Sequence, residues 1–368
     1  MSTAIYVRPV GRLTRPPARI NASPDKVVRI AEREDLVFTA LELIHRHADG
    51  WSDRRVISVD EARNMIAQQN PATDALLQAS DRFAAPRGPL ANLPLDRPRI
   101  MGIVNVTPDS FSDGGNFLTP RDAIAHALRL EEEGADFLDI GGESTRPGAA
   151  SVSLDEELSR VMPVLEGLVG KTRCRLSIDT RKAEVMRRAV AAGVHILNDI
   201  SALTNDPRSL RIAVESKLPI VLMHAQGDPS TMQRDPRYQN VLLDVYDQLE
   251  SRVETCVRAG IPRERLIVDP GIGFGKTAAH NIELLAGLSL FHGLGTSLLL
   301  GASRKSFIGA LTGAVDPAER IPGSIAAALA AAMSGAQILR VHDVAETRQA
   351  LTIWEAAMTG NAAQLLPI

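Results

Sequence analysis

Eight short runs of apolar residues follow one another through residues 99–368 of this 368-residue chain, and segments with helical periodicity separate them. The runs lie at 100–105, 137–140, 175–179, 196–200, 219–223, 266–269, 297–301 and 337–341. Helices are expected between them, most clearly at 122–133, 154–168, 182–192, 240–259 and 324–334. Because parallel strands need a crossover connection that a helix usually supplies, this alternation predicts a parallel sheet.

Eight strands in a segment of this length predict a closed (β/α)8 TIM barrel, which takes about 250 residues. An open, doubly wound sheet is the alternative. Such a sheet often carries a Gly-x-Gly-x-x-Gly turn after its first strand, and no such turn follows residues 100–105. The sequence therefore predicts a catalytic barrel domain at residues 99–368.

A separate N-terminal extension at residues 1–98 is expected, because a proline-rich stretch at 86–98 divides it from the barrel pattern. The extension is expected to be mostly helical, and its role is left open. Its expected helices are 35–46, a helix from the Ser58 and Glu61 capping box through Ile66, and a helix from Pro71 with Leu76, Leu77 and Phe83 inward. Without clustered ligands or a nucleophile, it is expected to serve packing or subunit contact.

Composition narrows the class of protein. Hydrophobic residues make up 45% of the chain and charged residues 23%, which is typical of a folded globular protein. The net charge of −3 argues against a dedicated nucleic-acid binder, and no apolar run reaches the length of a membrane span. Small molecules are therefore the expected binding partners.

Cysteine and histidine usage gives no sign of a zinc site. Cys174 and Cys256 are the only cysteines and are expected to be free thiols in a reducing cytoplasm. His45 and His47 lie two positions apart on an expected helix, so they would not share a face. An arginine-rich start without an acidic residue before Asp25 leaves an organellar address as the alternative to the cytoplasm.

Polar or glycine-rich segments follow the eight expected strands, at 105–109, 141–148, 179–181, 198–199, 223–224, 269–276, 303–306 and 340–343. In a barrel these segments converge on one rim, where such enzymes hold their active sites. Asp179, Asn198 and Asp269 could accept several N–H groups along one edge of a heterocycle. The alternative is that strand-end residues such as Asp179 and Asp199 cap the helices that follow.

Positive charge gathers on the same expected rim, at Arg304, Lys305, Arg340 and His342. With glycine-rich turns at helix starts, these side chains suit a phosphate or pyrophosphate; solvated surface charges are the alternative. Two glycine-rich loops, 109–115 and 141–150, are candidate lids. No Gly-x-Ser-x-Gly elbow occurs, so covalent catalysis is disfavoured.

These segments closely resemble those of the dihydropteroate synthases, folate-pathway enzymes that sulfonamides target. The resembling segments are 101–115, 139–148, 177–180, 198–200, 269–276, 303–306 and 340–344. They cover the whole expected barrel in order, and the family fold is a (β/α)8 barrel. The resemblance implies Mg²⁺-dependent condensation of 6-hydroxymethyl-7,8-dihydropterin pyrophosphate with 4-aminobenzoate, by SN1-like loss of pyrophosphate, in an enzyme that is usually a homodimer.

The resemblance also implies roles for individual residues. The pterin-binding residues would be Asp179, Asn198, Ile200, Met223, Asp269, Phe274 and Lys305. The aminobenzoate pocket would hold Thr145, Arg146, Pro147, Phe274, Lys305 and Ser306. The pyrophosphate would meet Asn105, Arg340 and His342, with Asn105 also meeting the metal. The catalytic set would be Asn105, Asp179, Lys305, Arg340 and His342.

The sequence departs from the family pattern at two places, and two alternative functions are weighed against the one that the resemblance implies. Ala225 stands where the family often has methionine, which we interpret as a packing variation, and the first 98 residues have no counterpart in the family core. A methyltetrahydrofolate:corrinoid methyltransferase would share the pterin-reading residues but would not need the Ser303–Ser306 segment. The other rival is a pterin-binding scaffold without activity.

Overall fold

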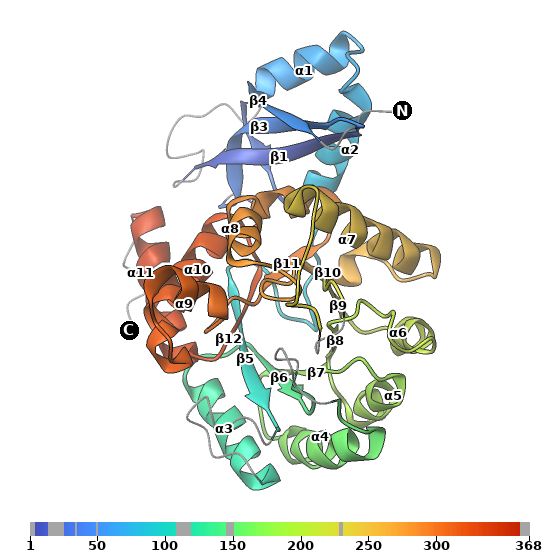
Figure 1. Ribbon diagram of the computed structural model, residues 1–368, viewed down its shortest axis with the longest axis vertical. Helices are drawn as coiled ribbons and strands as arrows, with labels where there is room; N and C mark the ends of the chain where they lie inside the picture. The colour runs from blue at the N-terminus through green and yellow to red at the C-terminus, as the bar shows by residue number, and fades with distance from the viewer. Residues whose placement is uncertain are drawn as a thin grey trace.

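The computed structural model describes residues 4–13, 26–33, 35–48, 51–107, 119–144, 151–227 and 231–360. Its main body is a closed barrel of eight parallel strands in chain order (Figure 1). The strands are β5 (Arg99–Asn105), β6 (Phe137–Gly141), β7 (Arg175–Asp179), β8 (Ile196–Asp199), β9 (Ile220–Met223), β10 (Leu266–Asp269), β11 (Ser297–Leu300) and β12 (Ile338–Val341). The predicted (β/α)8 barrel is confirmed.

Helices surround the barrel. They are α3 (Pro120–Glu132), α4 (Leu154–Leu168), α5 (Ala183–Ala192), α6 (Ser209–Ser216), α7 (Val241–Arg258), α8 (Ala278–Ala286), α9 (Ser306–Thr312), α10 (Ile321–Met333) and α11 (Val344–Thr359), with short 3₁₀ turns η4 (Arg263–Arg265), η5 (Leu288–Leu294) and η6 (Pro317–Arg320). Side chains of Thr119, Ser153, Asn240 and Thr277 cap four of the helices. These polar residues end the preceding loops, because their oxygens accept the first free backbone N–H groups of the helix.

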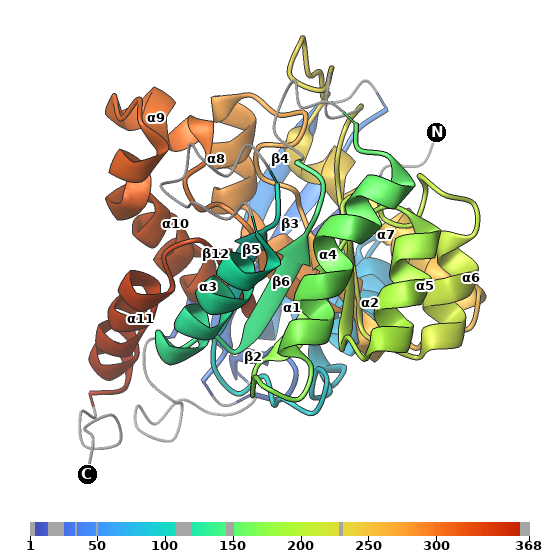
Figure 2. The same ribbon diagram turned by 90° about the horizontal axis from the view of Figure 1, so that it is seen from below.

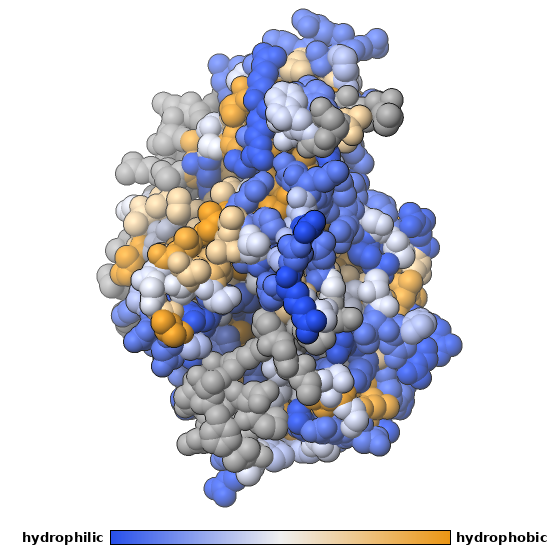
Figure 3. Space-filling view, in the orientation of Figure 1, coloured by the Kyte–Doolittle hydropathy of each residue, from blue (hydrophilic) through white to orange (hydrophobic). Residues whose placement is uncertain are grey.

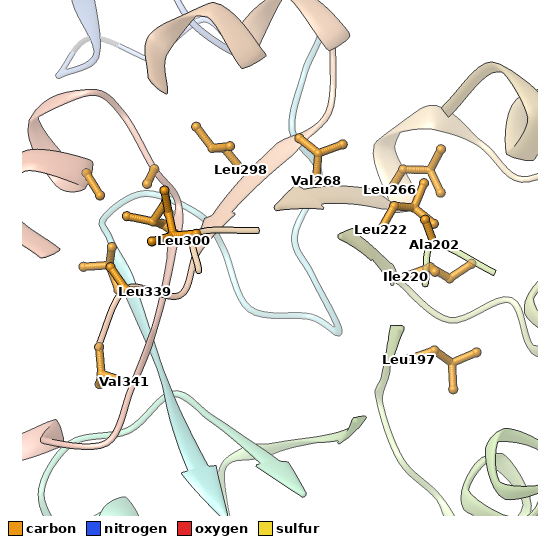
Figure 4. Packing of buried hydrophobic residues seen from close by; sticks show 14 of the residues in the cluster. Leu197, Ala202, Ile220, Leu222, Leu266, Val268, Leu298, Leu300, Leu339 and Val341 are labelled. Carbon is orange, nitrogen blue, oxygen red and sulfur yellow. The ribbon is translucent and has the colours of Figure 1, made fainter. Parts of the chain in front are cut away.

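Alternate residues along seven of the eight strands build two apolar layers, and in β7 the polar Ser177 lies between the outward Leu176 and Ile178. On β9, Ile220 and Leu222 belong to the cluster between strands and helices, whereas Val221 belongs to the cluster inside the barrel. Figure 4 shows side chains of the outer cluster on successive strands, facing away from the barrel interior. Apolar side chains thus fill both sides of the barrel wall, and the polar site residues lie at the carboxyl ends of the strands.

The proline-rich stretch before the barrel does more than connect two parts of the chain. Leu90 and Leu95 are buried in the inner cluster together with Met101 and Phe137, which lie at the amino ends of β5 and β6. The connection therefore closes the amino-terminal end of the barrel. A ligand has to enter from the opposite end.

The N-terminal part is an α+β domain, so the expectation of a mostly helical extension is wrong. Its antiparallel sheet has β1 (Ala4–Arg12) on one side of β3 (Val37–Arg46), with β2 (Val28–Arg29) and β4 (Ser52–Ser58) on the other. Helices α1 (Val59–Ala67) and α2 (Thr73–Ala84) complete it. The Ser58 cap of α1 is confirmed, while Leu77, expected on the inner face of α2, is exposed.

The helix expected at 35–46 is instead the central strand β3. Leu41 and Leu43 pack inside the N-terminal domain, while Ile44 joins the barrel's outer cluster, so apolar residues are needed on both faces. Such a doubly buried strand cannot be told from a helix by periodicity. Because side chains two positions apart lie on the same side of an extended chain, His45 and His47 share one side, and both approach Asp53.

The N-terminal domain packs against the side of the barrel (Figures 1 and 2), where β1 and α2 contact η5, Arg46 contacts α7 and Arg12 contacts the end of α10. Ser289 of η5 donates to the Pro9 carbonyl over 2.8 Å, and buried Arg87 donates to the Thr296 and His292 carbonyls over 2.7 and 3.3 Å. Within the described ranges, no helix is long and apolar enough to cross a membrane.

Candidate active site

The predicted meeting of strand-end side chains at the carboxyl end of the barrel is visible in the contacts of two glycines. A methyl group on Gly141 of β6 would lie 3.7 Å from Asp179 Oδ2 and 3.8 Å from Asn105 Oδ1. A methyl group on Gly301, just after β11, would lie 3.8 Å from both Asp269 Oδ2 and Arg340 Cβ. The small residues let these polar groups approach one another across the mouth.

Arg340 is the centre of this polar cluster. Its Nε donates to Asp139 Oδ2 over 2.6 Å, and its Nη2 donates to Asp179 Oδ2 over 2.7 Å. Asn198 Nδ2 also donates to Asp139 Oδ2, over 2.9 Å. Burial raises the pKa of Asp179 above its usual range, and the charge of Asp139 acts in the same direction against the opposing pull of Arg340.

Asp139 was missed by the sequence reasoning as a site residue. It is fully buried in β6, and its Oδ1 has no hydrogen-bond partner among the described residues. An acid in the middle of an apolar strand is a usable signal, because a buried carboxylate needs partners. Its neighbours here are the predicted pterin and pyrophosphate residues themselves.

The second part of the cluster lies on the glycine-rich turn after β10. Asp269 Oδ1 accepts from Gly271 N over 2.8 Å, and Lys305 Nζ donates to the Ile272 carbonyl and lies 4.5 Å from the centre of the Phe274 ring. Gly271 has a φ of +68°, and a methyl group there would lie 1.9 Å from the His224 carbonyl oxygen. Only glycine fits this turn, which supports Lys305 from beneath.

Burial also shifts the pKa values of Asp269 and Lys305 in this second part of the cluster. It raises the pKa of Asp269 and lowers the pKa of Lys305 to about 8, although Asp269 favours the ammonium form. The site thus holds carboxylates that resist ionisation and a lysine that loses its proton easily. Opposite shifts of this kind are typical of functional sites.

The competing interpretation of strand-end acids as helix caps fails for both residues, because α5 and α6 begin after Lys182 and Arg208 without a side-chain cap. Asp199 accepts from the backbone N–H groups of Ser201 and Leu203 over 2.7 and 3.1 Å, so it organises its own loop. Asp179 instead pairs with Arg340. Asp179 therefore remains a candidate ligand-binding residue and Asp199 does not.

The remaining predicted residues are placed as follows. His342 contacts Ser303 Oγ through its backbone N–H over 3.2 Å and through Nδ1 over 3.0 Å. Ser306 is exposed at the first turn of α9. Arg304, expected on the anion-binding rim, pairs with Asp343, Nε to Oδ2 over 3.0 Å.

A cavity of about 300 Å³ lies on the far side of Phe274 from Lys305, between the loops after β8 and β9 and helix α7, and none of the polar cluster residues lines it. Its lining includes Ile200, Met223 and Phe274, the three residues predicted to contact the pterin ring, and also Ala225. Predicted residues Thr145, Arg146 and Pro147 lie outside the described residues, as do most of the two predicted loops, 109–115 and 141–150. The polar residues of the predicted pterin set thus meet around Arg340 and the glycine-rich turn, the three apolar ones line the cavity, and part of the aminobenzoate set lies outside the described residues.

A buried lysine–histidine pair behind the glycine-rich turn was also missed. Lys276 Nζ lies 2.8 Å from His224 Nδ1 and donates to the Phe274 carbonyl over 2.9 Å. Burial lowers the pKa of His224 to about 3 and that of Lys276 well below its usual value. The pair holds the Phe274 backbone, and a lysine directly after a glycine-rich turn was the available signal.

A divalent metal fits the site only together with a phosphate-bearing ligand. No group of three histidine, cysteine or acidic side chains in the described part of the chain could hold a metal ion. Asn105 Oδ1, near Asp179, is an oxygen ligand of the kind that Mg²⁺ accepts. Because Mg²⁺ usually takes one or two protein oxygens and completes its shell with water and phosphate, the donor set suits a metal that arrives with pyrophosphate.

Comparison with known proteins agrees with this geometry. The sequence model of a family described as pterin binding enzyme matches residues 101–342. The dihydropteroate synthase of Escherichia coli (strain K12) is 49% identical over 270 residues, which are 73% of this chain and 95% of that protein.

Two solved structures are similar as well. The dihydropteroate synthase of Yersinia pestis, solved with a sulfonamide drug complex, is 50% identical with a TM-score of 0.70 over 72% of this chain and 96% of that one. That of Xanthomonas albilineans, in complex with 7,8-dihydropteroate, is 50% identical with a TM-score of 0.66 over 75% and 97%. The chain belongs to the pterin-binding enzyme family and, within it, to the dihydropteroate synthases.

Proposed function

We propose that this chain condenses 6-hydroxymethyl-7,8-dihydropterin pyrophosphate with 4-aminobenzoate, giving 7,8-dihydropteroate and pyrophosphate. The observation that carries the proposal is the buried cluster in which Arg340 joins Asp139 and Asp179, with Asn198 on the same carboxylate. Such a cluster offers acceptors and donors for a flat heterocycle and positive charge for a diphosphate.

Each side chain has a task in the proposed reaction. Asp179, Asn198 and Asp269 bind the polar edge of the pterin, and Ile200, Met223 and Phe274 line its faces. Lys305 contributes to both substrate sites, and Ser306 with Thr145, Arg146 and Pro147 completes the aminobenzoate pocket. A ligand without the matching N–H groups would leave buried acceptors unpaired, which disfavours its binding by about 1–3 kcal/mol per group.

The bond between the pterin methylene carbon and the pyrophosphate oxygen breaks first, and the oxygen keeps the electron pair. Arg340, His342 and Asn105 stabilise the negative charge that develops on the departing group. The neutral amine of aminobenzoate then attacks the methylene carbon and loses one proton, so positioning matters more than a strong base. When bound, Mg²⁺ would neutralise charge on the diphosphate, with Asn105 as its protein ligand.

We also propose that the chain acts as a homodimer in the cytoplasm. Apolar side chains of Leu311, Val315, Met333 and Ile353 are exposed on or beside α9, α10 and α11, where apolar surface gathers on the left of Figure 3. Cys174 and Cys256 are both free and buried, which suits a reducing compartment. Sedimentation equilibrium should give twice the 39.6 kDa chain mass, and a 39.6 kDa species would contradict the dimer.

A two-substrate assay tests the proposed reaction. Purified protein with Mg²⁺ and dihydropterin pyrophosphate should release pyrophosphate and form pteroate when aminobenzoate is added. Methyl transfer from methyltetrahydrofolate to a corrinoid, without pteroate formation, would favour the rival methyltransferase. Pterin binding with neither reaction would favour an inactive scaffold.

A further inference from the structure

We infer that the N-terminal domain positions the active site, and that Arg46 is the positioning residue through which it acts. The inference rests on the proposed function, because it assigns a role toward the same substrates. It concerns the part of the chain that lies outside the family match at residues 101–342.

Arg46 ends β3 and reaches three acceptors on or just before α7. Its Nη2 donates to Asp244 Oδ1 over 2.5 Å and to Gln239 Oε1 over 3.3 Å, and its Nη1 donates to Asp247 Oδ2 over 3.1 Å. Tyr6 of β1 donates to the two Asp247 oxygens over 2.9 and 3.0 Å. The Arg46 and Asp244 side chains are each only 18% exposed, so these charge-assisted bonds are poorly screened by water.

Asp244 also binds the chain segment that precedes α7. While its Oδ1 accepts from Arg46, its Oδ2 accepts from the backbone N–H groups of Gln239 and Asn240 over 2.9 and 3.2 Å. Asn240 also donates to Ser52 Oγ of the N-terminal domain over 3.4 Å. The N-terminal domain therefore fixes the end of the segment at 231–240.

The same segment contacts the glycine-rich turn after β10. Tyr238 OH donates to the Gly275 carbonyl over 2.8 Å, and Gln233 Nε2 donates to the Gly273 carbonyl over 2.5 Å. Gly273 and Gly275 have φ values of +84° and +62°. A turn made of such flexible residues depends on outside contacts to keep one shape.

The glycine-rich turn contacts Lys305 of the active site. Lys305 Nζ donates to the Ile272 carbonyl, and a methyl group on Gly273 would lie 3.0 Å from Lys305 Cδ. Phe274, on the same turn, lies under the ammonium group. Contacts thus run without a gap from Arg46 through Asp244 and Tyr238 to the two residues shared by both proposed substrate pockets.

The test compares two arginines that dock the same domain at different places. Arg12 donates to the Ala332 carbonyl near the carboxyl end of α10 and lies 5.2 Å from the Trp354 ring, away from the rim. In the full-length chain, Arg46→Ala should raise the KM for aminobenzoate about three- to tenfold while kcat changes less. Arg12→Ala should lower the melting temperature without changing either KM.

Two further measurements keep the inference decidable. Tyr238→Phe removes one contact of the series without disturbing the domain interface, and it should raise the same KM. Amide hydrogen exchange at 271–276 should become faster in Arg46→Ala than in Arg12→Ala.

Three results would overturn the inference: KM values within twofold of wild type in Arg46→Ala, an equal rise of KM in Arg12→Ala, or unchanged exchange at 271–276. If the wild-type chain forms no pteroate, the proposed function fails. The exchange experiment then still decides whether Arg46 holds the turn.

Discussion

Arg340 Nε lies 2.6 Å from Asp139 Oδ2, a fully buried oxygen that also accepts from Asn198 Nδ2. This ion pair connects β12 to β6 and, through Asn198, to β8. The guanidinium is held from two sides, because its Nη2 also donates to Asp179. Arg340 is thus oriented before any substrate arrives, which is the condition for efficient stabilisation of a leaving anion.

Replacing Asp139 should impair turnover, although Asp139 acts only by positioning Arg340. We expect Asp139→Asn to lower kcat/KM at least about tenfold, or about 1.4 kcal/mol of transition-state stabilisation, because Arg340 loses one charged partner. Steady-state kinetics on the folded variant measures this. Asp81→Asn, an exposed substitution on α2, is the control. A kcat/KM equal to that of the wild type would show that Asp179 alone orients Arg340.

The rate should fall in alkaline solution through loss of the Lys305 charge. Burial lowers the pKa of Lys305 to about 8, so the ammonium form is present below that pH and is lost as pH rises through it. We expect kcat/KM to decline above about pH 8, and Lys305→Ala to lower it at least about tenfold. The charge of Lys305→Arg persists, so its alkaline limb should lie at higher pH. An unchanged limb in Lys305→Arg would assign the decline to another group.

Metal dependence should respond to Asn105. Chelation should stop pteroate formation and added Mg²⁺ should restore it, because the described residues offer too few ligands to retain the ion without a diphosphate. Asn105→Ala should raise the Mg²⁺ concentration that gives half-maximal rate. A rate that is insensitive to chelation would remove the metal from the proposal.

The interface between the two domains should carry measurable stability. Arg87 is buried and donates to the Thr296, Arg82 and His292 carbonyls over 2.7, 3.0 and 3.3 Å. Arg87→Ala removes these buried hydrogen bonds, so we expect the free energy of unfolding to fall by about 2–4 kcal/mol. Urea titration measures the change, and exposed Arg63→Ala should stay within about 0.5 kcal/mol. Equal stability of the two variants would contradict a tightly docked domain.

The barrel was predictable because its signals are local. The predicted strands 175–179 and 266–269 agree with β7 and β10, since each is a short apolar run that ends in an aspartate and a turn. The N-terminal sheet was not predictable, because β3 packs against both the barrel and its own helices and so lacks the alternation of a one-sided strand.

For a similar reason, some residues of the site could be predicted from the sequence and others could not. Asp179, Asn198, Asp269 and Arg340 could be predicted to meet, because barrel topology brings all carboxyl ends of the strands together. The role of Asp139 depends on a contact between β6 and β12, and that of Lys276 on its position behind the turn. Such partnerships arise from packing, and spacing along the chain does not specify them.

The most direct test is a crystal structure of the full chain with 7,8-dihydropteroate. We expect the bicyclic ring to lie among Asp179, Asn198 and Asp269, with the aminobenzoyl group leaving the barrel past Lys305 and Phe274. A product molecule bound away from these side chains, or one whose ring nitrogens face none of the three, would contradict it.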